Sequence, residues 1–291
     1  MLVFILSCIL VAFFIYRYVF TLRYRRHFPS CIIIIGGTKG LGAALIREFR
    51  VYCPLATIYC VARHVPVVAH RVDHVNYVVG NVMESSQWDV ETMFPDCDDA
   101  WVINCAGMAR CDYFTDIENI EEVTMQMIDL NLTASIHAAH VFLRLPKTRY
   151  MMIASVLAHI SIPGYSIYAT SKAALKAFYE ALCTEGLGER VGIVYANTML
   201  TEGYKAEEAY GKPNITKWIE SYDSPQTPDQ AALVLVRELL RYGCHGEHVT
   251  SWSSIFYASR VISYFAFPAI MHDIFRFWWC PSLVHQDKKQ K

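Results

Sequence analysis

The sequence carries little charge of either sign. Only 18% of its 291 residues are Asp, Glu, Lys or Arg, against about 25% in typical soluble domains, and the net charge is −1. Without an excess of positive charge there is no global basic field, and we expect no nucleic-acid partner. The chain also has no CxxC pair and no Cys/His spacing typical of a metal site, so we expect no metal.

Repeats and low-complexity linkers are also absent from the sequence. The length fits one large α/β domain with additional segments, long enough to bury a sizeable core. The ten cysteines favour buried, reduced thiols in a domain that faces the cytosol. Hydrophobic residues make up 54% of the chain, and the excess is concentrated at its two ends.

The N-terminal end is a long apolar run. Residues 2–16 are apolar apart from Ser7, residues 18–22 extend the run, and Arg23, Arg25 and Arg26 follow it. A spanning helix needs about 20 apolar residues. A cleaved signal peptide has its positive charge before the apolar run, the reverse of the order here. We therefore predict a transmembrane anchor over residues 1–22, with the following chain in the cytosol; a signal peptide or a buried core helix is the alternative.

The C-terminal end is aromatic but less uniformly apolar. Residues 254–279 include several charged side chains, among them Arg260, Asp273 and Arg276, which make a spanning helix unfavourable. The pattern favours an apolar, membrane-associated segment over residues 242–284 that lies on the membrane. A C-terminal helix packed on the core is the alternative.

A basic tail follows over residues 285–291. Its Lys288 and Lys289 resemble the dilysine retrieval signal of endoplasmic reticulum membrane proteins, which is read from the cytosol. We therefore expect localisation to the endoplasmic reticulum membrane, with the catalytic domain facing the cytosol. This expectation requires that the preceding apolar segment does not cross the membrane.

Between the two ends, short buried runs alternate with helical patterns. Predicted strands cover residues 31–35, 56–61, 75–79, 100–103, 150–154 and 191–195, and helical patterns include residues 43–52, 121–143 and 166–187. Short buried strands that alternate with helices are typical of a parallel sheet. We predict the α/β fold class, a Rossmann-type doubly wound parallel sheet in one domain over residues 29–241.

A glycine-rich loop follows the first predicted strand and opens the first helix. A dinucleotide pyrophosphate needs close backbone approach and free N–H groups at this position. The loop therefore predicts nicotinamide-cofactor contacts, and its candidate residues are Gly36, Thr38, Lys39, Gly40, Leu41 and Gly42.

The residue that follows the second strand distinguishes NAD from NADP. Arg63 occupies this position, no carboxylate lies nearby, and Lys39 in the glycine loop could reach the same phosphate. Two cations without an acid favour NADP(H). Asn81 and Val82 after the third strand, and Asn104, Ala106 and Gly107 at the end of the fourth, are the predicted contacts on the adenine side.

Tyr168 and Lys172 are four residues apart on a predicted helix and therefore share one face. A fixed ammonium beside a phenol lowers the pKa of the phenol, which would make Tyr168 a proton donor and acceptor. Ser155 closes the fifth strand, where its hydroxyl could hold a substrate carbonyl. Asn131 could anchor a water that relays protons to Lys172. These four residues are the predicted catalytic set.

In this order, the glycine loop, Asn-x-Ala-Gly, Asn131, Ser155 and Tyr-x-x-x-Lys resemble the short-chain dehydrogenase/reductase family over residues 30–200. The resemblance implies the Rossmann-type fold and hydride transfer between NADPH/NADP+ and a carbonyl or alcohol. Tyr168, Lys172 and Thr201 are expected among the cofactor contacts as well. A homodimer through the helices that carry Asn131 and Tyr168 is possible, as in many relatives.

A narrower resemblance is to the 3-ketodihydrosphingosine reductase subfamily. It rests on residues 104–109, 201–204, 207–208, 212–219 and 227–230, which keep that subfamily's pattern in order. The implied reaction is NADPH-dependent reduction of 3-ketosphinganine to sphinganine, with a long-chain sphingoid ketone as the membrane lipid substrate.

Several residues depart from the family pattern. Ile35 stands in place of Thr before the glycine loop, Asn81 in place of Asp, and Ala196-Asn197 in place of a Pro-containing turn. The stretch from Arg63 to Asn81 is short, so we expect no full helix there. Two alternatives stay open: another membrane-bound short-chain reductase acting on a steroid, a retinoid or a 3-ketoacyl thioester, or a catalytically weak NADP-binding scaffold or sensor.

Overall fold

The computed structural model describes residues 28–66, 71–95, 97, 99–208 and 211–250. Its sheet has seven parallel strands in the order β3-β2-β1-β4-β5-β6-β7, which confirms the predicted Rossmann-type α/β fold. The strands are β1 (Cys31–Ile35), β2 (Thr57–Ala62), β3 (Val75–Val79), β4 (Ala100–Asn104), β5 (Arg149–Ser155), β6 (Val191–Ala196) and β7 (Gly246–Val249).

The central strand β1 explains why the sheet is covered on both faces. All five of its residues are buried, and successive side chains point to opposite faces. Ile33 and Ile35 join one hydrophobic cluster, and Ile32 and Ile34 join the other. Such a continuous run of buried β-branched residues is typical of a parallel strand that helices cover on both faces.

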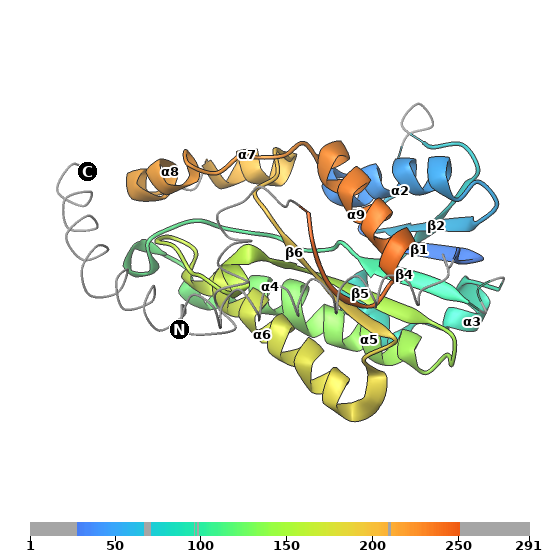
Figure 1. Ribbon diagram of the computed structural model, residues 1–291. Coiled ribbons are helices and arrows are strands. Elements are labelled where there is room, and N and C mark those ends of the chain that lie inside the picture. The colour runs from blue at the N-terminus through green and yellow to red at the C-terminus, as the bar shows by residue number, and fades with distance from the viewer. Residues whose placement is uncertain (1–27, 67–70, 96, 98, 209–210, 251–291) are drawn as a thin grey trace, which may run out of the picture.

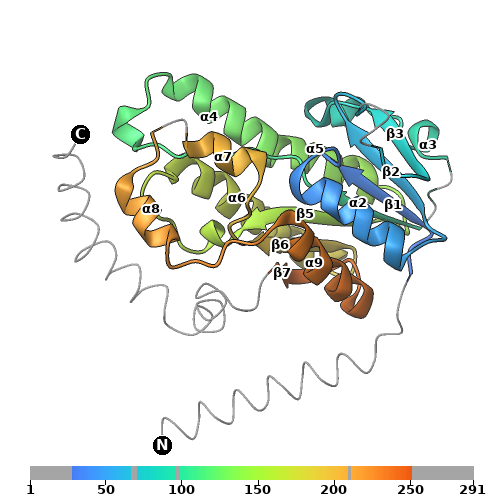
Figure 2. The ribbon, with the colours of Figure 1, turned by 90° about the horizontal axis from the view of Figure 1, so that it is seen from above.

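Helices cover the two faces as two layers (Figure 1). One layer holds α2 (Gly40–Tyr52) and α9 (Pro228–Tyr242), and the other holds α4 (Ile120–Ile128), α5 (Ala134–Leu143) and α6 (Ser166–Leu182). The described part of the chain also contains three short α-helices: α3 (Val90–Met93), α7 (Glu202–Glu208) and α8 (Asn214–Glu220). Figure 2 shows α7 and α8 at the end of the molecule away from α3.

The helix predicted over residues 121–143 is interrupted in the structure. A π-helical turn at Asp129–Thr133 separates α4 from α5 and carries Asn131. The side chain of Asn131 binds the backbone of Met108 from this turn, a tertiary contact that helical periodicity does not reveal. Between β2 and β3, the described residues contain no helix, as the sequence predicts.

The prediction of reduced cysteines is wrong for one pair. Cys31 and Cys97 form a disulfide, with their Cα atoms 5.2 Å apart. The pairing arises because Cys31 begins β1 and Cys97 precedes the adjacent strand β4. The other described cysteines are free.

The sheet extends beyond Arg241, where the sequence predicts the catalytic domain to end, because Gly246–Val249 pairs with β6 as β7. The predicted anchor over residues 1–22 and most of the predicted C-terminal segment lie outside the described residues. Within the described part of the chain, no helix is long and apolar enough to cross a membrane.

Candidate active site

A cavity of about 1130 Å³ opens where the parallel strands β1, β4, β5 and β6 end. The connections from β1 and β4 leave the sheet to opposite faces, and ligands of doubly wound folds bind in the crevice at such a point. Every predicted site residue lines this cavity except Asn104 and Asn131. The sheet therefore brings together residues from the glycine loop to Thr201.

The glycine loop lies against its neighbours so tightly that side chains are excluded. A Cβ atom on Gly42 would lie 2.3 Å from the carbonyl oxygen of Gly36. A Cβ atom on Gly36 would lie 2.9 Å from the backbone nitrogen of Ala106, and the φ of Gly36 is +77°. The loop turns directly into α2, whose first N–H groups face the cavity end of the sheet. This cradle fits a dinucleotide pyrophosphate.

The two predicted phosphate-binding cations differ in their surroundings. Arg63 lines the cavity at the end of β2, is exposed, and has no hydrogen-bonding or ion-pair partner among the described residues. Lys39 also lines the cavity, but its ammonium binds the carboxylate of Glu202 at 2.7 Å. Arg63 is therefore the cation that is available to a ligand without breaking an existing contact.

The residues predicted on the adenine side divide into two groups. Val82, Ala106 and Gly107 line the cavity as predicted. Asn81 lines it too, but its side chain caps the following turn by accepting from the Met83 N–H at 3.2 Å.

Asn104 does not line the cavity, and its cofactor contact stays a prediction. Asn104 is buried beneath the site, where its amide donates to the Tyr150 hydroxyl at 3.0 Å. Its amide oxygen accepts from the Ala106 N–H at 3.1 Å, which shapes the turn after β4. The residue supports the cavity wall without facing the cavity.

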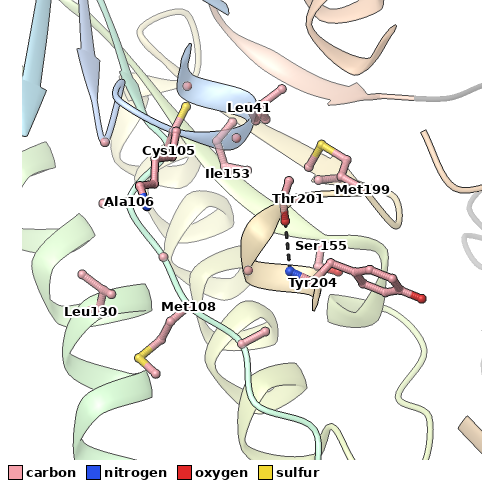
Figure 3. A pocket seen from close by; sticks show the side chains of 18 of the residues that line it. Leu41, Cys105, Ala106, Met108, Leu130, Ile153, Ser155, Met199, Thr201 and Tyr204 are labelled. Atoms are coloured by element: carbon pink, nitrogen blue, oxygen red, sulfur yellow. Dashed lines mark hydrogen bonds between the residues drawn. The ribbon is translucent and has the colours of Figure 1, made fainter. Parts of the chain in front are cut away.

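Thr201 joins the segment after β6 to the cofactor side of the cavity. Its hydroxyl oxygen accepts from the Tyr204 N–H at 3.1 Å and so caps the start of α7 (Figure 3). The side chain of Thr201 lies next to Gly40, since a Cβ on that glycine would be 3.4 Å from it. In Figure 3, Thr201 lies across from Cys105, Ala106 and Met108, and the ring of Tyr204 points away from these three residues.

The predicted catalytic residues Ser155, Tyr168 and Lys172 meet in the middle of the cavity. Ser155 ends β5 and shares a hydrogen bond with Tyr168, which lies in the first turn of α6. The Lys172 ammonium lies 5.7 Å from the centre of the Tyr168 ring and donates to the carbonyl oxygen of Ile153 at 2.9 Å. A substrate carbonyl beside Tyr168 would therefore meet two hydroxyl groups and a cation.

Burial dominates the acid–base properties of this set. It raises the pKa of Tyr168 to about 12, although the hydrogen bond with Ser155 opposes the shift. It lowers the pKa of Lys172 to about 8, because the ammonium loses its hydration. The expected lowering of the Tyr168 pKa by Lys172 is not seen in the protein alone, since desolvation of the phenolate is the larger effect.

Asn131 is close to Lys172 but does not face the cavity. Its amide accepts from the Met108 N–H and donates to the Met108 carbonyl, each at 2.9 Å, and it also donates to the Ser171 hydroxyl at 3.0 Å. These bonds tie the segment after β4 to α6. These contacts give Asn131 a positioning role, and its water relay to Lys172 stays a prediction.

Two features of the cavity were not predicted from the sequence. Asn197 lies at the end of β6, is only 6% exposed, and its side-chain nitrogen has no hydrogen-bonding partner among the described residues. A cluster of ionised groups around Tyr165 lines the far end of the cavity and includes Glu207 and Glu220. The three-residue spacing of Tyr165 and Tyr168 on one helix face was a signal that could have indicated the second feature.

Comparisons with known proteins agree with this geometry. The sequence is 28% identical over 224 residues to a PIGF/3-ketodihydrosphingosine reductase fusion protein of Schizosaccharomyces pombe, over 69% of this chain and 44% of that protein. The chain thus spans less than half the length of the fusion protein. It is 24% identical over 294 residues to the 3-ketodihydrosphingosine reductase ksrA of Aspergillus fumigatus, covering 80% of this chain and 76% of that one. It is also 24% identical to the 11-beta-hydroxysteroid dehydrogenase-like 6 of Arabidopsis thaliana, over 74% of this chain and 67% of that one.

Solved structures share the fold. A short-chain dehydrogenase of Streptomyces avermitilis superposes with a TM-score of 0.64 at 18% identity, covering 86% of this chain and 98% of that one. A short-chain dehydrogenase of Burkholderia cenocepacia in complex with NADP gives a TM-score of 0.62 at 16% identity, over 83% and 97% of the two chains. The family model for short chain dehydrogenases matches residues 30–209, which is more than half of the sequence. The chain therefore belongs to the short-chain dehydrogenase family, whose members are oxidoreductases that use NAD(P)(H).

Proposed function

We propose that this protein reduces 3-ketosphinganine to sphinganine with NADPH. The observation that carries the proposal is the single cavity in which Ser155, Tyr168 and Lys172 lie between the glycine loop and the segment after β6. Support for the sphingoid substrate comes from relatives named 3-ketodihydrosphingosine reductase and 3-dehydrosphinganine reductase.

Each catalytic residue has a separate role in the reduction of the carbonyl. When bound, the nicotinamide supplies a hydride to the C3 carbon. Ser155 donates a hydrogen bond to the carbonyl oxygen, and Tyr168 donates the proton that completes the hydroxyl group. Burial raises the pKa of Tyr168 to about 12, so at neutral pH the phenol holds the proton that the carbonyl oxygen receives. The Lys172 ammonium stabilises the phenolate that remains.

The cofactor residues support NADPH over NADH. The glycine loop and the start of α2 would hold the pyrophosphate, and Arg63 would bind the extra phosphate of NADPH as an exposed cation. The side-chain nitrogen of Asn197, buried and without a partner among the described residues, would donate to the nicotinamide carboxamide. A buried donor without an acceptor is costly, so a ligand oxygen at this point is favourable.

The membrane setting is part of the same proposal. The apolar run over residues 1–22 would anchor the chain in the endoplasmic reticulum membrane with the catalytic domain in the cytosol, and residues 242–284 would add an apolar contact. A substrate with a long alkyl chain would then reach the cavity from the bilayer. Pairing of two copies through the helices that carry Asn131 and Tyr168 would give a homodimer.

The test is turnover by the full chain, purified in detergent or reconstituted in vesicles. NADPH and NADH are each supplied with 3-ketosphinganine, and sphinganine is identified by mass spectrometry. We expect NADPH-dependent product formation, and a fall in kcat of about 10²–10⁴-fold in Tyr168→Phe, the range typical of a lost general acid. A wild-type rate no higher than that of Tyr168→Phe would overturn the proposal.

A second candidate function is reduction of a steroid ketone. Its support is the similarity to two hydroxysteroid dehydrogenase-like proteins of Arabidopsis thaliana. The catalytic set is equally suited to both substrates, so the distinction lies in the segment after β6. A panel that includes a steroid ketone, a retinal and a 3-ketoacyl thioester beside 3-ketosphinganine decides between them by kcat/KM.

A further inference from the structure

The far end of the cavity is lined by three carboxylates. Glu207 belongs to α7, Glu220 ends α8, and Asp223 follows in the next turn, where its N–H donates to the Glu220 carbonyl at 3.0 Å. The mechanism proposed for the carbonyl uses none of them. They nevertheless line the same cavity as the catalytic tyrosine.

Tyr165 connects this end of the cavity to the catalytic centre. Tyr165 is the N-cap of α6, and its ring lies 5.8 Å from the ring of Tyr168 in the first turn of that helix. Its hydroxyl contacts Glu207 Oε2 at 2.5 Å and Glu220 Oε1 at 2.9 Å. The charge of Glu207 is felt at Tyr168, whose pKa it helps to raise. Glu207 therefore acts on the catalytic tyrosine through its charge, and Glu220 contacts the same Tyr165 hydroxyl as Glu207.

One cation already binds this cluster, but from behind the cavity wall. The Lys212 ammonium lies 2.8 Å from Glu220 Oε2 and 3.8 Å from Glu207 Oε2, and its side chain is 0% exposed. It also packs 4.3 Å from the centre of the Tyr204 ring, whose hydroxyl donates to Glu220 at 3.1 Å. Lys212 is not among the residues that line the cavity, whereas Glu207 and Glu220 both are.

Asp223 provides independent evidence that a ligand with a hydrogen-bond donor fits this end of the cavity. Its Oδ1 accepts from the Ser224 N–H at 2.9 Å, whereas its Oδ2 is buried and has no partner among the described residues. A buried carboxylate oxygen without a donor is expensive. A positively charged N–H donor from the ligand would remove that cost and form a charge-assisted hydrogen bond.

We propose that Asp223, Glu220 and Glu207 form a subsite for the ammonium group of an amino ketone, with the amine on the carbon next to the carbonyl that Tyr168 protonates. This inference rests on the proposed function, because 3-ketosphinganine carries an amine at C2 beside its C3 ketone. It assigns substrate selection to residues outside the catalytic set. A ketone with a neutral amide or a hydroxyl group at that carbon leaves the Asp223 oxygen without a cation and is selected against.

The subsite is tested first by binding, which does not depend on turnover. The full chain loaded with NADP+ is titrated with sphinganine and with N-acetylsphinganine, and both dissociation constants are measured by tryptophan fluorescence. The same pair is measured with Asp223→Asn, which keeps the bond from Ser224, with Glu220→Gln, and with Glu180→Gln. Glu180 is an exposed acid on α6 paired with Lys176, so it serves as the matched control outside the cavity.

We expect wild type and Glu180→Gln to bind the amine at least about tenfold more tightly than the amide, the effect of one charge-assisted contact. Asp223→Asn and Glu220→Gln should reduce this ratio toward one while binding of the amide changes little. A ratio near one in wild type, or a ratio that survives both substitutions, overturns the inference. Loss of binding to both ligands in one variant is read as misfolding of that variant, and the other then decides.

Turnover separates the inference from the function on which it rests. Selective amine binding without NADPH-dependent reduction of 3-ketosphinganine would sink the proposed function and leave the subsite standing. Reduction of 3-ketosphinganine and of its desamino analogue with equal kcat/KM would support the proposed function and overturn the subsite.

Discussion

The two halves of the cavity are lined by different kinds of groups. The cofactor half is formed by backbone and small side chains at the ends of β1 and β4, with one exposed ion pair, Lys39 with Glu202, at its edge. The substrate half is formed by buried ionised side chains on short helices after β6. The sheet therefore positions the residues of the cofactor half, whereas the residues of the substrate half are held in place by pairing with one another.

Removal of one cation from each half tests this contrast and should give the largest difference. Lys212→Met leaves Glu207 and Glu220 buried without their ammonium, and we expect the free energy of unfolding to fall by about 3–5 kcal/mol. Lys39→Met breaks an exposed pair, and we expect little measurable change in stability. Both are measured by denaturant unfolding of the full chain in detergent. Equal changes in the free energy of unfolding for the two substitutions would contradict the difference between the two halves of the cavity.

We expect the cofactor half to be sensitive to added side-chain volume, whereas the substrate half is sensitive to the loss of a charge. Gly42→Ala places a Cβ 2.3 Å from the Gly36 carbonyl oxygen, so the loop must move. We expect a loss of roughly 1–3 kcal/mol in stability and at least about tenfold weaker NADPH binding, measured by fluorescence titration. Gly188→Ala is the matched control, because its nearest neighbour would lie at 3.8 Å. Unchanged NADPH binding in Gly42→Ala would show that the loop is not the cradle.

Lys172 stands where the two halves meet, and its charge is unfavourable to folding. Its side chain is buried, and its pKa falls from 10.5 to about 8. Below pH 8 the folded and unfolded states both hold the proton, so the full cost of burying the charge is present. The cost shrinks between pH 8 and 10.5, where only the unfolded state keeps the proton, and is absent above that range.

We therefore expect Lys172→Met to abolish turnover while raising the free energy of unfolding at pH 7 by roughly 1–3 kcal/mol. The gain over wild type should disappear by about pH 10.5. Unfolding curves of both proteins at pH 7 and pH 10.5 give the comparison. A destabilised variant at pH 7 would show that the bond from Lys172 to the Ile153 carbonyl outweighs the burial of charge.

The same contrast explains what the sequence could predict. The glycine loop, Ser155, Tyr168 and Lys172 were found because each lies within or beside a strand or helix whose pattern is local. Their order along the chain is the order in which a parallel sheet presents its strand ends. Residue type, spacing and topology together therefore placed them in one cavity.

The contacts that the sequence did not reveal have a common physical origin. Asn104 and Asn131 have the expected residue type and position, but their amides bind Tyr150, 46 residues away, and Met108, 23 residues away. The substrate half went unpredicted because Tyr165 meets Glu207 and Glu220 across 42 and 55 residues. No local pattern reports which way an amide turns or which carboxylates share a hydroxyl, because tertiary packing decides both.

The smallest expected effect concerns a charge in the cofactor half that acts on the ligand alone. Arg63 is exposed and has no partner among the described residues, so Arg63→Ser should leave stability unchanged. Loss of its contact with the extra phosphate should lower kcat/KM for NADPH about tenfold, while kcat/KM for NADH stays constant. Arg47→Ser is the control, since Arg47 pairs with Asp229 outside the cavity. An equal fall in kcat/KM for NADPH and NADH would show that Arg63 binds a part of the cofactor that both share. The preference for NADPH must then come from Lys39 after its release from Glu202.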